Sequence, residues 1–258
     1  MKAAIVIPIY KTELTEIEKI SLNQCNKVLG DNDIFYASPK GLNPSEKLLP
    51  FKNEEFDPEY FKDIQGYNRL MLESHFYERF LNYDYILIYQ LDAFVFRDEL
   101  ATWCDKNYDY IGSPWIATQN IFSKLLKPFA SKKIKKRAPI FFKVGNGGFS
   151  LRKTKTFYEI SKKLENNIKE QLKNKEEIYA IEDVFWSLKV PAFFPEFSIP
   201  DYKEAVKFSI DRKPELALKL NKNELPFGCH GINKGKVIKF WKPILDKAYS
   251  KNGLPSTQ

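Results

Sequence analysis

A run of five apolar residues, Tyr85 to Tyr89 (YILIY), constrains the fold of this chain more than any other stretch. A strand covered on one face alternates apolar and polar residues, whereas a continuous apolar run is typical of a strand covered on both faces. Gln90, Leu91 and Asp92 follow the run directly. The pattern therefore predicts the central strand of an α/β fold, with polar groups where that strand ends.

Predicted strands and helices alternate along the first half of the chain. Strands are expected over residues 3–9, 33–37, 85–89 and 108–111, and another over 140–151 with glycines inside it. Helices are expected over residues 14–28, 57–81, 153–172 and 242–249, and one more begins at 183. This alternation predicts an open α/β sheet with helices on its flanks, and antiparallel pairing is expected around the glycines. Ligands of such sheets bind beyond the carboxyl ends of the strands, where Tyr10, Ser38 and Asp92 fall.

Composition excludes several classes of protein. The three cysteines, Cys25, Cys104 and Cys229, are far apart and form no CxxC pair, so we expect neither a disulfide framework nor a zinc site, and a reducing compartment. No run of apolar residues approaches the 18 or so that suggest a membrane span. The N-terminal apolar run is followed by KTELTEIEK without a cleavage site of small residues, so we interpret it as a buried first strand rather than a signal peptide.

The net charge of +8 is concentrated in one basic segment. Its cations are Lys124, Lys127, Lys132, Lys133, Lys135, Lys136, Arg137 and Lys143, and apolar residues such as Leu125, Leu126 and Phe129 are interleaved with them. Nucleic acid, an anionic lipid surface and a solvated loop all agree with this composition. The mixture of cations and apolar residues is also typical of peripheral contact with an anionic membrane.

Two acidic positions are candidates for chemistry. Asp92, at the mouth of a buried strand, could hold Mg²⁺ or Mn²⁺ through its carboxylate, or it could cap a turn. Glu182 and Asp183 precede an apolar stretch, where acidic side chains stabilise the first turn of a helix. The same carboxylates could instead act as a general base for a hydroxyl group. Both interpretations of each position remain open from spacing alone.

Glycines and one histidine supply further candidates. Gly145, Gly147 and Gly148 interrupt an apolar strand pattern, which indicates close approach of a ligand or a bulge. We expect the ligand to be a sugar. His230 stands between glycines in a predicted loop, and an imidazole there could bind Mn²⁺. Lys234, Lys236 and Lys239 follow closely enough to meet phosphate oxygens.

In this order, the features resemble a GT-A-type nucleotide-sugar glycosyltransferase, and most closely a bacterial family known as a domain of unknown function. The resemblance spans roughly residues 3 to 243. The matching stretches are Ile7-Pro8-Ile9-Tyr10 for the nucleotide base, Gln90-Leu91-Asp92 for a DxD-type motif, Gly147 to Arg152 for a GGxSxR-like stretch, Glu182-Asp183 for an acidic pair and His230 for a C-terminal metal ligand.

The resemblance implies a separate role for each of these residues. Asp183 is expected to be the base of an inverting reaction, with Glu182 as its neighbour, and Asp92 and His230 are expected to hold Mn²⁺ or Mg²⁺. Gln90 replaces the first acid of the DxD motif, which leaves Asp92 as its only carboxylate. The residues expected to bind the donor are Pro8, Ile9, Tyr10, Ser38, Gln90, Leu91, Asp92, Gly147, Gly148, Arg152, Lys234 and Lys236.

The expected fold is a GT-A-like, Rossmann-like open mixed sheet in a single domain over residues 1–258. We expect a nucleotide-sugar half over about 1–112 and an acceptor half over about 113–258, which carries the basic loop 123–143.

The expected activity is transfer of a hexose-type sugar, from a UDP-sugar by preference, to a glycan or lipid-linked acceptor in bacterial surface polysaccharide or glycoconjugate synthesis. A cytoplasmic location is expected, with peripheral contact to the inner face of the cell membrane through the basic loop. No nucleic-acid partner is expected, because no recognisable binding motif accompanies the charge. Two alternatives stay open: a non-catalytic carbohydrate-binding protein on a degenerate transferase fold, which Gln90 favours, and a nucleic-acid-binding module.

Overall fold

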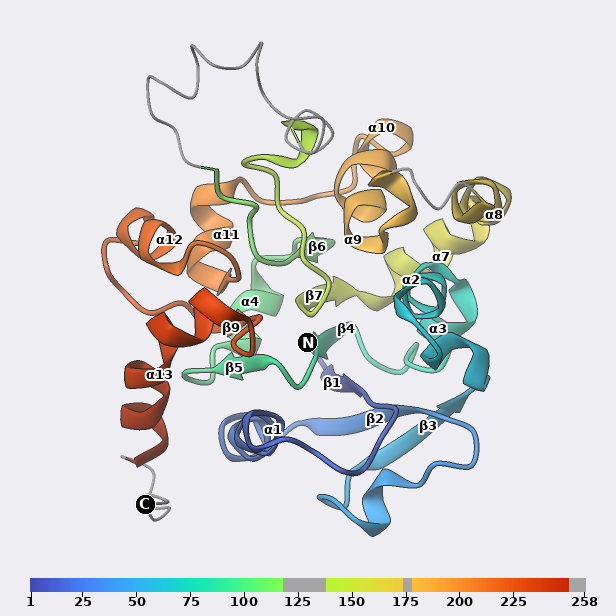
Figure 1. Cartoon of the computed structure of the whole chain (residues 1–258). Coiled ribbons are helices and arrows are strands. Elements are labelled where there is room, and N and C mark those ends of the chain that lie inside the picture. The colour runs from blue at the N-terminus through green and yellow to red at the C-terminus, as the bar shows by residue number, and fades with distance from the viewer. Residues whose placement is uncertain (118–137, 174–177, 251–258) are drawn as a thin grey trace.

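A six-stranded sheet in the order β3-β2-β1-β4-β7-β6 forms the centre of the molecule (Figure 1). The computed structural model describes residues 1–117, 138–173 and 178–250. The strands of the sheet are β1 (Ala3–Pro8), β2 (Asp33–Pro39), β3 (Lys52–Phe56), β4 (Tyr85–Tyr89), β6 (Tyr110–Ile111) and β7 (Phe149–Lys153). Most of the predicted basic loop 123–143 lies outside the described residues.

Strand direction gathers the chemically interesting residues at one edge of the sheet. Strands β3, β2, β1 and β4 are parallel, whereas β7 is antiparallel to both β4 and β6. The carboxyl end of β4 therefore meets the amino end of β7, and Tyr89 is paired with Phe149. Consequently Gln90 and Gly148 are also neighbours, and the Gln90 amide donates to the Gly148 carbonyl at 2.8 Å.

Helices cover both faces of the sheet, as the continuous apolar run of β4 requires. On one face, Ile86 and Ile88 belong to a core shared with α2 (Ile64–Leu72), α3 (Ser74–Glu78) and α7 (Thr154–Lys163). On the other, Tyr85, Leu87 and Tyr89 belong to a core shared with α1 (Glu16–Leu29), α4 (Leu100–Asp105) and α11 (Tyr202–Phe208). The helix that follows β1 therefore covers one face of the sheet, and the helices that precede β4 cover the other. The boundary between β1 and β4 is the topological switch point of the sheet.

A second, three-stranded sheet lies beside the first and carries the C-terminal part of the chain. It has the order β5-β9-β8 and consists of β5 (Ala93–Val95), β8 (Ser209–Ile210) and β9 (Gly228–His230). Its core includes Phe94, Cys229 and Trp241, packed with α12 (Pro214–Leu220) and α13 (Gly235–Ser250). Because β5 follows β4 by only three residues, this sheet holds His230 close to Asp92.

Short helical elements complete the fold: η1 (Pro44–Glu46), η2 (Pro58–Phe61), η4 (Ala138–Ile140), α8 (Glu165–Lys173), η5 (Ile178–Ala180), α9 (Glu182–Val184), η6 (Phe185–Lys189, a π-helix) and α10 (Val190–Phe193). None of the helices in the described ranges combines the length and apolar character that crossing a bilayer requires.

The predicted α/β class and mixed sheet are confirmed, while several element boundaries differ. The expected helix over 57–81 is divided into η2, α2 and α3. Glu73, in an extended conformation (φ −86, ψ 141), separates α2 from α3. The expected helix over 153–172 is divided into α7 and α8 at Leu164. The last helix begins at Gly235, so Pro243 lies inside α13 and not in a first turn.

The expected strand over 140–151 is also shorter than predicted. Residues 138–140 form the 3₁₀ turn η4, and β7 begins only at Phe149. Gly145, Gly147 and Gly148 therefore precede the strand and do not interrupt it. Asn146 lies among them with a φ of 64, in the left-handed region that asparagine tolerates.

Candidate functional site

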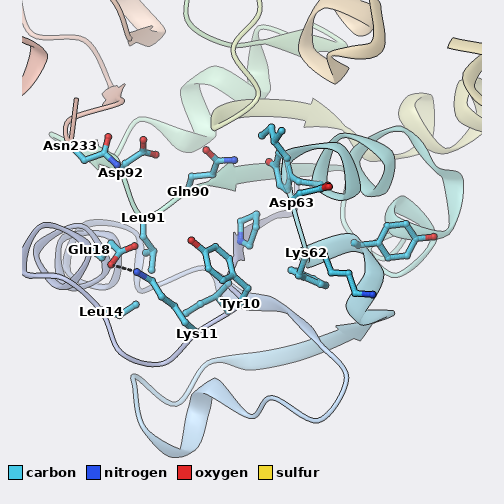
Figure 2. A pocket seen from close by; sticks show the side chains of 16 residues that line it. Tyr10, Lys11, Leu14, Glu18, Lys62, Asp63, Gln90, Leu91, Asp92 and Asn233 are labelled. Carbon is cyan, nitrogen blue, oxygen red and sulfur yellow. Dashed lines mark hydrogen bonds and ion pairs between the residues drawn. The ribbon is translucent and has the colours of Figure 1, made fainter. Parts of the chain in front are cut away.

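A pocket of about 450 Å³ opens at the switch point, beyond the carboxyl ends of β1 and β4 (Figure 2). Ligands of open α/β sheets bind at this place. Figure 2 shows Gln90 and Asp92 at one end of the pocket with Asn233, and Lys62 and Asp63 at the other. The lining residues are Pro8, Ile9, Tyr10, Lys11, Leu14, Glu18, Tyr60, Phe61, Lys62, Asp63, Ile64, Tyr67, Gln90, Leu91, Asp92 and Asn233.

The end of β1 supplies one wall of the pocket, as the sequence predicted. The Ile9 amide still donates to Ala37 of β2, at 2.9 Å, and the chain then leaves the sheet at Tyr10. The Tyr10 side chain is 64% exposed, and the Lys11 ammonium lies 6.0 Å from the centre of its ring. An exposed aromatic ring at the mouth of a polar pocket offers a flat surface on which a planar ligand group can stack.

Ser38, the predicted donor-binding residue at the end of β2, does not line this pocket. Its side chain is fully buried, and its hydroxyl contacts Leu42 O at 3.1 Å and Asn53 Oδ1 at 2.9 Å. The structure thus gives Ser38 a place in the connection between β2 and β3.

The predicted metal ligands Asp92 and His230 are in direct contact. His230 Nε2 lies 2.8 Å from Asp92 Oδ1 and 3.1 Å from Gln90 Oε1, so one ring nitrogen meets both side chains of the DxD-like stretch. Burial lowers the pKa of His230, but Asp92 and Asp211 outweigh burial and raise it to about 9. Burial raises the pKa of Asp92, and His230 and Lys234 reverse this effect, so that it lies below its usual range.

The same cluster contains Asp211, whose sequence context offers no reason to single it out. Asp211 follows β8 directly, and the pairing of Ile210 with Cys229 places it opposite His230. Its Oδ1 atom lies 3.6 Å from His230 Nδ1 and 3.4 Å from Lys234 Nζ. Burial raises the pKa of Asp211, whereas His230, Lys234 and Arg212 together lower it below its usual value.

These donor atoms fit a divalent cation that a diphosphate also binds. Carboxylate oxygen, amide oxygen and imidazole nitrogen are all ligands of Mn²⁺, and Asp92 Oδ1, Gln90 Oε1 and His230 Nε2 meet at one point. Within the described ranges, however, no group of three or more His, Cys, Asp or Glu side chains could hold a metal ion. Asp92, Gln90 and His230 could therefore supply only part of a coordination shell, and ligand oxygens and water would have to supply the rest.

The glycine run connects this cluster to the acidic pair. A methyl group on Gly148 would overlap His230 Nε2 and Gln90 Oε1, and one on Gly147 would overlap Glu182 Oε1. A methyl group on Gly145 would overlap the ring of Trp115. Protein side chains thus account for all three glycines without a bound sugar. Two adjacent residues of the chain hold the Asp92–His230 cluster and the Glu182–Asp183 pair side by side.

Arg152 is bound to the acidic pair rather than to the pocket. It is fully buried, and its guanidinium donates to Glu182 Oε1 at 3.0 Å, Tyr77 Oη at 2.8 Å and Ser150 Oγ at 3.1 Å. It does not line the pocket, although the sequence suggested a role in donor binding.

Glu182 and Asp183 each have one carboxylate oxygen without a hydrogen-bond partner among the described residues. Glu182 is 2% exposed, and burial raises its pKa to about 7 although Arg152 opposes the shift. Burial also raises the pKa of Asp183, against the lowering effect of hydrogen bonds from the Gly147 and Val184 amides. Glu182 Oε2 and Asp183 Oδ1 are buried without a hydrogen-bond partner in the described structure. A buried carboxylate oxygen without a partner is costly unless a water molecule or a ligand donates a hydrogen bond to it.

The remaining predicted residues lie around the pocket and the cluster. Lys234 is half-exposed beside Asp211, and Lys236 is exposed near the start of α13. Tyr67 of α2 also lines the pocket, and its hydroxyl is buried close to Gln90. Asn233 also lines the pocket and was not predicted.

Similar folds occur in solved structures of glycosyltransferases. The galactosyltransferase LgtC, solved with donor and acceptor sugar analogues, is 14% identical, with 98% of each chain covered and a TM-score of 0.57. A glycosyltransferase involved in glycosylation of the major capsid of PBCV-1 is 12% identical, with 97% of this chain and 100% of that chain covered and a TM-score of 0.53. Mouse xyloside xylosyltransferase 1 is 9% identical, with 90% and 98% covered and a TM-score of 0.51.

These likenesses show that the chain has a GT-A fold. None of the curated proteins with which the sequence was compared matches it. Residues 50–230 match a family whose description is "Protein of unknown function (DUF5672)", a range that includes the acidic pair, the glycine run and His230. The chain belongs to this family.

Proposed function

We propose that the protein is a glycosyltransferase that moves a hexose-type sugar from a nucleotide-diphospho-sugar, preferably a UDP-sugar, to a hydroxyl group of a glycan or lipid-linked acceptor. One observation carries the proposal. Gly147 and Gly148 bring the acids Glu182 and Asp183 beside the Gln90–Asp92–His230 cluster, of which Gln90 and Asp92 line the switch-point pocket. A group that can bind a diphosphate and a group that can accept a proton therefore lie next to each other.

The donor would lie with its base toward Tyr10 and its diphosphate toward Asp92 and His230. Asp92, His230 and Gln90 would hold Mn²⁺ or Mg²⁺, which when bound neutralises the charge that develops on the leaving diphosphate. Lys234 and Lys236 would add positive charge on the same side, since phosphate oxygens attract ammonium groups. Arg152 is not assigned this role, because it is buried and donates to Glu182 instead.

Asp183 would act as the base of a single displacement. The acceptor oxygen forms its bond to the anomeric carbon as the bond from that carbon to the diphosphate oxygen breaks, and the hydroxyl proton passes to Asp183. Attack from the face opposite the leaving group inverts the anomeric carbon. The raised pKa of Asp183 makes it a stronger base than an exposed aspartate. Glu182 Oε2, which has no partner, would accept a hydrogen bond from a sugar hydroxyl.

In this proposal the chain works as one domain, with the donor half over about 1–112 and the acceptor half over about 113–258. A role in bacterial surface polysaccharide or glycoconjugate synthesis, in the cytoplasm and at the inner face of the membrane, would follow if the acceptor is lipid-linked.

A donor screen by thermal unfolding tests the proposal. UDP-, GDP- and CMP-sugars are added with and without Mn²⁺, and the midpoint of unfolding is measured. At 100 times its dissociation constant a ligand stabilises the folded protein by about 2.7 kcal/mol, which raises the midpoint of a protein of this size by several degrees. One nucleotide series should stabilise the wild type, and Mn²⁺ should add less to Asp92→Asn. If no donor stabilises the protein, the proposal is wrong.

Gln90 favours a second candidate, a carbohydrate-binding protein without activity, because it removes one carboxylate from the DxD-like stretch. Release of nucleoside diphosphate from the stabilising donor separates the two candidates. An enzyme releases it, at least slowly to water, whereas a binding protein retains the donor unchanged.

A further inference from the structure

The His230 imidazole lies between two carboxylates that contact opposite nitrogens of its ring. Nε2 faces Asp92 Oδ1 at 2.8 Å, and Nδ1 faces Asp211 Oδ1 at 3.6 Å. Only 8% of the His230 side chain and 5% of the Asp211 side chain are exposed, so water does not replace either contact easily. Nδ1 itself is buried and makes no closer hydrogen bond within the described residues. Asp211 is therefore the acceptor available to an Nδ1–H group.

The backbone fixes this arrangement. Strand β9 ends at His230 and is paired on one side with β5, where His230 faces Ala93, and on the other side with β8. Asp211 follows β8 directly, so the three-stranded sheet sets its distance from the imidazole. Lys234 at 3.4 Å and Arg212 at 3.6 Å supply positive charge to the Asp211 carboxylate, which makes its burial less costly.

We propose that Asp211 is a positioning residue that accepts a hydrogen bond from His230 Nδ1–H and thereby directs the Nε2 lone pair toward the metal ion of the donor site. Histidines that bind metals generally donate their other N–H to a carboxylate or carbonyl group, which fixes the tautomer and the orientation of the ring. Asp92 and Asp211 then have separate roles, one at the metal ion and one behind the ring. This inference rests on the proposed function, because it assumes a metal-bound diphosphate at Asp92 and His230.

Metal affinity and the tautomer of His230 test the inference without measuring turnover. Mn²⁺ binding in the presence of UDP is followed by the electron paramagnetic resonance signal of free Mn²⁺ in the wild type, Asp211→Asn and the control Asp109→Asn. Like Asp211, Asp109 has a largely buried carboxylate. Asp109 accepts hydrogen bonds from the Ser198 amide at 2.8 Å and from Thr156 Oγ1 at 3.0 Å. Circular dichroism confirms that each variant is folded.

We expect Asp211→Asn to weaken Mn²⁺ binding about 10- to 100-fold and Asp109→Asn to leave it within about twofold of the wild type. Equal affinities of Asp211→Asn and the wild type would overturn the inference while leaving the donor site intact. Absence of Mn²⁺ and UDP binding by the wild type would instead overturn the proposed function, and the inference with it.

The tautomer is measured in His75→Asn, which leaves His230 and Asp211 unchanged, so this arm does not depend on the folding of an Asp211 variant. The chain has only two histidines, and His75→Asn leaves His230 as the single imidazole for ¹⁵N nuclear magnetic resonance. In the complex with Mg²⁺ and UDP, we expect the proton on Nδ1 and none on Nε2. A proton on Nε2 in that complex would contradict the role of Asp211.

Discussion

Asp183 lies in the first turn of α9, where a carboxylate can serve either the helix or the reaction. Asp201 is a matched control, because it caps α11 and accepts hydrogen bonds from the Lys203 and Glu204 amides. We expect Asp183→Asn to lower kcat about 10²- to 10⁴-fold, as the loss of a general base does, while affinity for the nucleotide stays within about twofold. Asp201→Asn should lower thermal stability and leave kcat unchanged. A similar kcat for Asp183→Asn and the wild type would assign Asp183 to the helix.

Gly148 lies against His230 and Gln90, the proposed metal ligands, and leaves no space for a side chain. In Gly148→Ala the new methyl group displaces His230 and Gln90, and we expect about tenfold weaker Mn²⁺-dependent donor binding and a loss of about 1–2 kcal/mol of unfolding free energy. The control is Gly235→Ala, where the methyl group meets open space. Calorimetric titration and thermal unfolding measure both effects. If Gly148→Ala binds the donor as tightly as the wild type, the present positions of His230 and Gln90 are not required for donor binding.

Individual site residues differed in how well the sequence predicted them. Asp92 and His230, which the structure brings into contact, could be singled out because each has a chemically informative side chain at the end of an element. Asp211 could not, since only the pairing of β8 with β9 brings it to His230. Arg152 was assigned to the donor because a cation beside glycines suits a phosphate, and nothing in the spacing reveals that Tyr77 and Glu182 enclose it.

At the scale of elements, Glu73 connects three short helices, two of which, η2 and α2, line the pocket. It receives hydrogen bonds from Tyr60 of η2 at 2.5 Å and Arg69 of α2 at 2.8 Å, and its carboxylate lies 3.3 Å from His75 Nδ1 of α3. Burial raises the pKa of Glu73, but His75, Tyr60 and Arg69 outweigh burial and lower it to about 2. The interactions of the ionised carboxylate therefore stabilise the folded state.

The sign of the resulting pH dependence follows from this lowered pKa. The stabilisation is complete above about pH 4.5, the ordinary pKa of a glutamate, and is lost as the pH falls toward 2. Between pH 6 and pH 3, we expect the wild type to lose about 2 kcal/mol more unfolding free energy than Glu73→Gln. Urea unfolding at several pH values measures the difference. Parallel curves for the two proteins would mean that Glu73 is no more stabilised than an exposed glutamate.

Elements with one dominant signal were predicted well. Strand β4 has the predicted bounds, because a continuous apolar run can only be satisfied between two helical layers. Strand β3 was missed, because its sequence KNEEF is polar, as suits the edge of a sheet. The break at Glu73 was missed as well, since the apolar spacing of α2 and α3 continues across it. The Glu73 side chain at the break accepts hydrogen bonds from Tyr60 and Arg69, which the spacing does not reveal.

For the whole molecule, the order of strands and helices determined the class of fold. Alternating strands and helices bury both faces of β4 when they form an α/β sheet. In a sheet with a switch point, the pocket lies at the carboxyl ends of the strands on either side of it, here β1 and β4. The three-stranded sheet could not be predicted, because its strands have two or three residues each and come from distant parts of the chain. The contact between His230 and Asp92, on which the proposed metal site rests, depends on this sheet.

The net charge of +8 belongs to the molecule as a whole, and its concentration in loop 123–143 predicts where a membrane would be bound. We expect the protein to sediment with anionic vesicles, to be released from them by salt and not to sediment with neutral vesicles. Each basic residue near an anionic surface contributes about 1 kcal/mol to the binding free energy. Replacing Lys132, Lys133, Lys135 and Lys136 with glutamine should abolish sedimentation. Replacing Lys155, Lys162, Lys163 and Lys169 of α7 and α8 removes the same charge and should leave it unchanged. Equal loss in both variants would mean that net charge, and not this loop, binds the membrane.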